Sequence, residues 1–186
     1  MATPEKFCKN FKLNLLRRNR QSYGTTVADP KENHSFSNMQ HDSLPVSGLW
    51  SSRAFQSVTP PIAVLIVDDD RAVAEALSAA LAFEGFRPAV VDGGYSAFLT
   101  PPALTPHIVI LDIEMPLCNG FAVAAAMRDS GRFSATPIIA YSSLAEAEVM
   151  ERGKEAQIDA FCRKGNSMRC LLALIDHLAP VQAAGI

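Results

Sequence analysis

Three carboxylates, a hydroxyl and an ammonium group follow short apolar runs in this sequence: Asp68, Asp69, Asp112, Ser142 and Lys164. Crowded carboxylates repel each other unless a cation or shared protons intervene. All-oxygen ligation suits Mg²⁺, which completes its shell with waters and phosphate oxygens. A carboxylate neutralised in this way can attack phosphorus and hold the product as an acyl phosphate, and a lysine and a serine can then meet the phosphoryl oxygens. The residue types predict one phosphate site, provided that the fold brings them together.

The apolar runs before these residues are short, continuous and bounded by polar residues, which is typical of strands buried on both faces of a sheet. These runs are 62–67, 108–111, 137–141 and 158–162. A further strand is predicted at 86–91, and Pro88 restricts it to an edge of the sheet because proline has no amide hydrogen to donate.

Helical segments are predicted between and after the strands. The first carries Val73, Leu77 and Leu81 on one face and ends at Gly85, and Asp70 is interpreted as its N-cap. The others are expected at 94–99, at about 121–130, at 144 to about 153, and after a cap at Asn166 or Ser167, with an apolar face of Leu171, Leu174, Ile175 and Leu178.

Five strand–helix units in about 120 residues predict an α/β fold, a doubly wound five-stranded parallel sheet. With Pro88 on an edge strand, the strand order 2-1-3-4-5 fits. The first and third strands are then neighbours, so that Asp68, Asp69 and Asp112 meet at the carboxyl edge of the sheet.

The 186 residues allow one full-sized domain and a tail. Residues 1–59 carry eight lysines and arginines against four acidic residues, whereas 60–186 carry nine against fifteen. The first region is also rich in Ser, Asn, Gln and Pro, so we expect a disordered basic N-terminal extension at 1–59 and a folded domain at 60–181.

No apolar stretch reaches the roughly 20 residues that span a bilayer, and no secretory signal is recognisable at the start. The four cysteines lack the spacing of a metal site. We therefore expect a cytoplasmic protein without a transmembrane segment. Phe7, Phe11 and Leu15 recur among basic residues, so the first twenty residues could form an amphipathic helix on a membrane or nucleic acid. A solvated extension is preferred, because so short a helix is marginal in water.

Residues 62–178 resemble the receiver domain of two-component response regulators in the segments VLIVDDD, ILDIEMPLCNG, PIIAYSS and IDAFCRKG. The resemblance implies the flavodoxin-like receiver fold, of the single-domain type. It implies that Asp112 accepts a phosphoryl group from a phosphohistidine of a histidine kinase or a histidine phosphotransfer protein. Asp69, Asp112 and the backbone carbonyl of Glu114 would bind Mg²⁺, and Asp68 would act on the metal largely through water.

The same resemblance assigns Ser142 as the switch hydroxyl, Phe161 as the switch aromatic and Lys164 as the cation that pairs with the phosphate. The alternation of apolar residues in this strand fits Phe161 as a core residue equally well. The usual proline after the lysine is replaced by Gly165. A cis bond before a residue other than proline costs about 2.5–4 kcal/mol, which leaves open whether the loop that aims Lys164 is trans or rebuilt.

The predicted function is a signalling switch rather than an enzyme, with only self-phosphorylation and autodephosphorylation chemistry. Because no residues follow Ile186, output is expected through contacts with an unknown downstream protein. The receiver's acidic charge argues against binding of nucleic acid by the domain itself. The main alternative is a phosphatase of the haloacid dehalogenase kind, whose D-x-D motif Asp68–Asp70 would match, although Ala72 stands where Thr or Val is expected. A flavodoxin-like cofactor site is weaker, because three aspartates would repel a phosphate.

Overall fold

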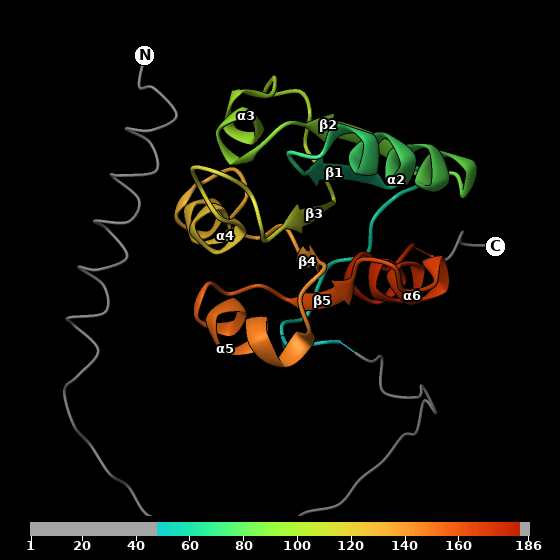
Figure 1. The fold of residues 1–186 in the computed structure, drawn as a ribbon. Helices are drawn as coiled ribbons and strands as arrows, with labels where there is room; N and C mark the ends of the chain where they lie inside the picture. The colour runs from blue at the N-terminus through green and yellow to red at the C-terminus, as the bar shows by residue number, and fades with distance from the viewer. Residues whose placement is uncertain (1–47, 183–186) are drawn as a thin grey trace, which may run out of the picture.

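The computed structural model describes residues 48–182, so the predictions for residues 1–47 lie outside the described part of the chain. Strands and helices alternate along it (Figure 1). The strands are β1 (Ala63–Val67), β2 (Arg87–Val91), β3 (Ile108–Asp112), β4 (Ile138–Ser142) and β5 (Ala160–Arg163). The helices are α2 (Arg71–Phe83), α3 (Gly94–Leu99), α4 (Gly120–Asp129), α5 (Glu146–Glu155) and α6 (Met168–Leu178).

The five strands form one parallel sheet in the order β2-β1-β3-β4-β5, which confirms the predicted topology. Pro88 lies in β2, opposite Val64 and at an edge of the sheet, as expected for a residue that cannot donate to two neighbours. In the register of β1 with β3, Val67 is opposite Leu111, so the residues that follow both strands emerge side by side.

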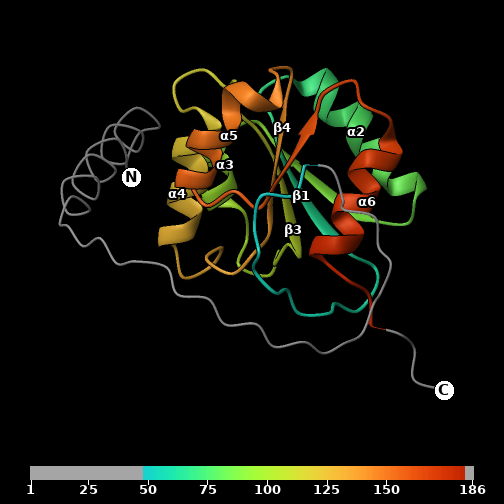
Figure 2. The same ribbon diagram turned by 90° about the horizontal axis from the view of Figure 1, so that it is seen from below.

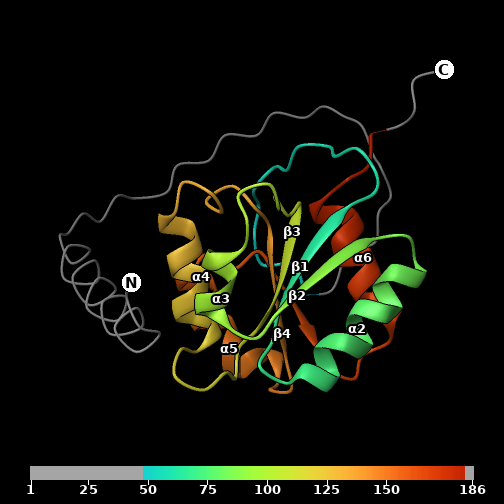
Figure 3. The ribbon, with the colours of Figure 1, turned by 90° about the horizontal axis from the view of Figure 1, so that it is seen from above.

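Helices cover both faces of the sheet, with α3, α4 and α5 on one face and α2 and α6 on the other (Figures 2 and 3). Each face has its own apolar core, and all five residues of β3 are buried between the two. The apolar face predicted for α6 is confirmed, since all four of its residues are buried. On α2, Leu77 and Leu81 are buried as predicted, but Ala74 rather than Val73 completes the buried face.

Most element bounds lie within one residue of the predicted ones, but α5 and β5 both start two residues later. Helix α5 starts at Glu146 rather than at Leu144, because the amide of Leu144 donates to the hydroxyl of Ser142 and keeps the preceding loop open. Strand β5 starts at Ala160, two residues later than predicted, and the amide of Asp159 donates to the carbonyl of Ile138.

The last residues of the predicted extension are ordered against the domain. Leu49 forms an antiparallel bridge with Ala160 of β5, and Val58 forms a parallel bridge with Val181. Leu49 and Phe55 pack on the α2/α6 core, and Trp50 packs on the other core. These apolar residues are isolated within a polar stretch and follow no period, so the pattern of the sequence does not reveal them.

A buried polar cluster lies at the amino end of β5. Asp159 is fully buried, and its carboxylate pairs with Arg128 at 2.6 Å and with Arg53 at 3.2 Å. It also accepts from the amide of Ile138 at 2.9 Å. The guanidinium of Arg128 donates further to backbone carbonyls of residues 133, 134, 136 and 157. The cluster joins α4, its following loop and β5.

Candidate functional site

The three predicted carboxylates converge at the carboxyl edge of the sheet. One carboxylate oxygen from each of Asp68, Asp69 and Asp112 lies within 4.8 Å of the others. Asp68 and Asp112 are buried, with 2% and 4% of their surfaces exposed, whereas Asp69 is exposed. The pairing of β1 with β3 produces this convergence, because Asp68 directly follows β1 and Asp112 ends β3.

The turn after β1 fixes these side chains. The amide of Asp70 donates to Oδ1 of Asp68 at 2.9 Å. The carboxylate of Asp70 accepts from the amides of Ala72 and Val73 at 3.0 and 3.1 Å, which confirms it as the N-cap of α2. Asp70 therefore serves the helix, and Asp68 and Asp69 face the site.

Lys164 reaches the carboxylates from the loop after β5. Its Nζ lies 2.9 Å from Oδ2 of Asp68 and 3.3 Å from Oδ1 of Asp112. Burial acts to lower the pKa of Lys164, but its contacts with Asp68 and Asp112 outweigh burial and raise the pKa above its usual value. The ammonium therefore stays charged and offsets part of the carboxylate repulsion.

The surroundings of Lys164 favour its charged form, whereas those of Asp112 favour its neutral form. Burial raises the pKa of its carboxyl above the usual value, although the amide of Glu114 and the ammonium of Lys164 act to lower it. The amide contact is a hydrogen bond of 3.2 Å to Oδ1 of Asp112. A further cation beside Asp112 would favour the charged, nucleophilic form.

The hydroxyl of Ser142 lies at the end of β4, next to the β3 partner strand. Ser142 is fully buried, and its Oγ accepts from the amide of Leu144 at 3.2 Å and donates to Oε2 of Glu114 at 3.4 Å. Ser143 also donates to the same oxygen of Glu114. Ser143 was not predicted to contribute, and its position next to Ser142 at a strand end is the only sequence signal that points to it.

Phe161 is a core residue in this structure, since only 6% of its surface is exposed and it belongs to the α3/α4/α5 core. Its ring stacks on that of Trp50. Its role as a switch stays a prediction. Gly165 has φ +91°, and Pro60–Pro61 is the only cis bond within residues 48–182, so the Lys164–Gly165 bond is trans. A glycine in the left-handed region thus replaces the usual proline, and Lys164 still reaches both carboxylates.

The donor set fits a magnesium ion. Three carboxylates within 4.8 Å offer the hard oxygen ligands that Mg²⁺ prefers, with one of them exposed to solvent for the entry of waters. The hydrogen bond from Glu114 to Asp112 places residue 114 beside this set. Participation of the Glu114 carbonyl as a ligand stays a prediction.

Comparisons with known proteins agree with this arrangement. Residues 64–176 match the family model of the response regulator receiver domain. The chain is similar to the response regulator MprA of Mycolicibacterium vanbaalenii, with 30% identity over 129 residues that make up 67% of this chain and 55% of MprA. It is also 33% identical, over 113 residues, to the DNA-binding response regulator MtrA of Mycolicibacterium paratuberculosis, covering 60% of this chain and 48% of MtrA. The chain thus spans about half the length of these curated relatives.

Solved structures confirm the fold. The chemotaxis protein CheY4 of Vibrio cholerae superimposes with a TM-score of 0.59 at 23% identity, covering 63% of this chain and 98% of CheY4. The receiver domain of the sensor histidine kinase PA1611 of Pseudomonas aeruginosa, whose structure has a magnesium ion in its active-site cleft, gives a TM-score of 0.57 at 19% identity, covering 63% of this chain and 97% of that one. Within residues 48–182, no helix is long and apolar enough to cross a membrane.

Proposed function

This chain belongs to the response regulator receiver domain family, and on that premise we propose that Asp112 accepts a phosphoryl group in a Mg²⁺-dependent reaction. A receiver domain is the phospho-accepting switch of two-component signalling. The observation that supports Asp112 as the acceptor is that this buried, strand-end carboxylate shares a cation with a second buried carboxylate. Lys164 contacts Asp112 and Asp68 at once, and Asp69 completes an acidic set within 4.8 Å.

The proposed reaction moves the phosphoryl group from an imidazole nitrogen to a carboxylate oxygen. An oxygen of Asp112 attacks phosphorus as the P–N bond of the phosphohistidine breaks, and the imidazole leaves with the electron pair of that bond. Asp69, Asp112 and the Glu114 carbonyl would hold Mg²⁺, with Asp68 acting through water, and a metal held there would supply positive charge to screen the phosphoryl oxygens. Lys164 already lies against Asp112 and needs only a short movement to pair with a phosphoryl oxygen.

The proposed switch starts at Ser142. A buried phosphoryl oxygen without a donor is costly, so phosphorylation draws the Ser142 hydroxyl away from Glu114, the acceptor it has in this structure. The loop between Ser142 and α5 follows, and Phe161 repacks beside it. Phosphorylation thereby supplies the differential contact that a two-state element requires.

The proposed donor is a histidine kinase or a histidine phosphotransfer protein, which places the chain in the cytoplasm. Output is proposed to pass through contacts with a downstream protein. The matches to receiver domains lend no support to a phosphatase of the haloacid dehalogenase kind. Self-phosphorylation from small donors and autodephosphorylation are the only chemical activities proposed. Binding of nucleic acid or membrane by residues 1–20 lies outside the described part of the chain.

Phosphorylation should depend on the metal. In a mixture of the full chain, Mg²⁺ and acetyl phosphate, one phosphoryl group should appear on Asp112, as located by peptide mass analysis. Excess EDTA should abolish the modification, and Asp69→Ala should reduce it to a similar extent because an exposed ligand is lost. Modification that persists in EDTA would show that the reaction does not require the metal.

Loss of the switch hydroxyl should separate phosphorylation from its conformational effect. Ser142→Ala should still be phosphorylated on Asp112, but most of the change in amide hydrogen exchange over residues 142–164 should disappear. Ser143→Ala is the matched control, because this exposed serine also donates to Glu114 and should leave the exchange response intact. A full response in Ser142→Ala would mean that the signal leaves the site by another route.

A further inference from the structure

The open edge of β5 is covered by the chain itself. The segment Gly48–Arg53, called the strap below, lies beside β5 (Figure 1, in cyan). The amide of Phe161 donates to the carbonyl of Gly48 at 2.7 Å. The amides of Trp50 and Ser51 donate to the carbonyl of Asp159 at 2.8 and 3.0 Å. The strap therefore satisfies hydrogen-bonding groups that an exposed edge strand would offer to another chain.

Two glycines make room for the strap. Gly48 has φ +90°, and a Cβ at that position would lie 2.2 Å from the carbonyl oxygen of Phe161. A Cβ at Gly153, inside α5, would lie 2.2 Å from Cζ3 of Trp50. A side chain at either position would exclude the strap from its present place. The close fit indicates a specific contact of the strap with β5 and α5.

Trp50 joins the strap to the elements that the proposed switch moves. Its ring stacks on Phe161 with ring centroids 5.6 Å apart and an interplanar angle of 9°. Its Nε1 donates to Oε1 of Glu146 at 2.7 Å. Glu146 is the first residue of α5 and follows Ser142 by four positions. Glu146 is thus connected to the loop that starts at Ser142, and Phe161 is the residue that the proposed switch repacks.

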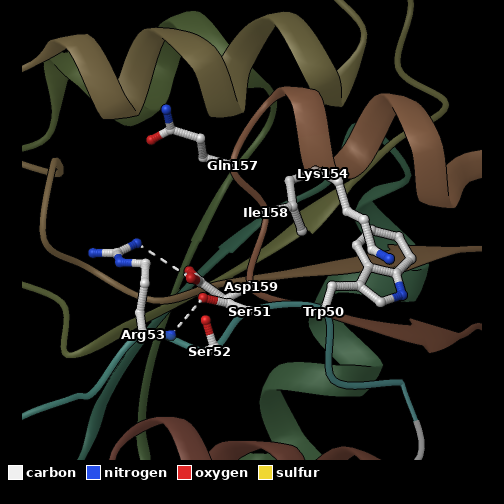
Figure 4. Close-up of a pocket in the computed structure, with 8 residues that line it drawn as sticks. All are labelled: Trp50, Ser51, Ser52, Arg53, Lys154, Gln157, Ile158 and Asp159. Atoms are coloured by element: carbon white, nitrogen blue, oxygen red, sulfur yellow. Dashed lines mark hydrogen bonds and ion pairs between the residues drawn. The ribbon is translucent and has the colours of Figure 1, made fainter. Parts of the chain in front are cut away.

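The other end of the strap is anchored on the buried cluster. Figure 4 shows the guanidinium of Arg53 pointing toward Asp159, with Trp50 at the opposite end of the same hollow beside Lys154 of α5. The Arg53–Asp159 contact is 3.2 Å. Because this anchor belongs to the amino end of β5, movement at the carboxyl edge would act first on the Trp50 end.

We propose that the strap is an autoinhibitory contact, docked on β5 when Asp112 is unphosphorylated and released when Asp112 is phosphorylated. The inference rests on the proposed function. Withdrawal of Ser142 toward a phosphoryl group shifts the loop that carries Glu146, and the indole N–H of Trp50 loses its acceptor. Repacking of Phe161 removes the stacked ring. Release uncovers the backbone edge of β5, which a protein partner can then bind with an extended peptide segment.

Trp50 reports directly on the strap, because it is the only tryptophan of the chain. The full chain is treated with Mg²⁺ and acetyl phosphate, and acrylamide quenching of tryptophan fluorescence is measured together with peptide mass in the same sample. Quenching should increase upon phosphorylation in the wild type and stay constant in Asp112→Ala. Phosphorylation of Asp112 with unchanged quenching would contradict the proposed release of the strap and leave the proposed function intact. Absence of phosphate on Asp112 would overturn both.

Linkage gives a second, reciprocal measurement. If docking of the strap opposes the phosphorylated state, Glu146→Ala should bind beryllofluoride, a mimic of the acyl phosphate, at least about fivefold more tightly in the presence of Mg²⁺. Glu148→Ala is the matched control, since it removes the same charge from the same turn of α5 at an exposed position. Equal affinities of the two variants, measured by calorimetry, would overturn the coupling.

Discussion

Asp112→Ala is expected to lose all phosphorylation by acetyl phosphate, the largest functional effect of any single substitution in this chain. The carboxylate of Asp112 is the one that contacts both Lys164 and the amide of Glu114. No other carboxylate of the acidic set has this placement, because Asp68 accepts from the turn amide of Asp70 and Asp69 is exposed. Peptide mass analysis after treatment with Mg²⁺ and acetyl phosphate measures the loss.

Asp70→Ala is the matched control for this substitution. It removes a neighbouring carboxylate that serves only as the N-cap of α2. We expect the variant to be phosphorylated normally and to lose about 1 kcal/mol of stability from the missing cap. Phosphate retained in Asp112→Ala, or mapped to Asp68 or Asp69, would show that the acceptor has been assigned wrongly.

The largest effect on stability is expected for Arg128→Met. The guanidinium of Arg128 is only 4% exposed and pairs with Asp159, whose side chain is 1% exposed. Removal of one partner of a buried ion pair leaves an uncompensated charge and typically costs about 3–5 kcal/mol. The carbonyls of residues 133, 134, 136 and 157 lose a donor as well. Urea unfolding should show a lower midpoint with little change in slope.

Arg53→Met tests the role of burial in this effect. Arg53 pairs with the same carboxylate, but its side chain is 37% exposed. Solvent screens such a contact, and its loss should cost less than about 1 kcal/mol. Equal free energies of unfolding for Arg128→Met and Arg53→Met would show that burial of the Arg128–Asp159 pair does not increase its contribution to stability.

The proximity of Asp68, Asp69, Asp112 and Lys164 could be predicted from the sequence because each of them lies at or just after the end of a strand. Runs such as 108–111 identify buried strands, and the edge position of Pro88 selects the strand order. Once the order is known, Asp68 and Asp112 must be neighbours. The cap at Asp70 could be predicted for a similar reason, since it depends on residues only two and three positions away.

Contacts between distant segments could not be predicted in the same way. Trp50 meets Glu146 across 96 residues and Arg53 meets Asp159 across 106, and no periodic pattern connects these pairs. Asp159 is hidden within an apolar run, where its charge gives no indication of its partner. The hydroxyl of Ser142 delays the start of α5 by a local hydrogen bond that competes with the helix, which propensity alone does not reveal.

Strand β5 separates two polar centres with different tasks. Asp159 precedes the strand and Lys164 follows it, and five residues of extended chain span about 17 Å at ~3.3 Å per residue. Free-energy changes at sites so far apart usually add when the sites share no partner, and substitutions that leave the strap unchanged meet this condition. A substitution at Glu114 that alters the lifetime of the phosphorylated state can therefore be combined with one that reinforces the packing around Arg128. The signalling lifetime and the melting temperature of this domain should be adjustable as two independent properties.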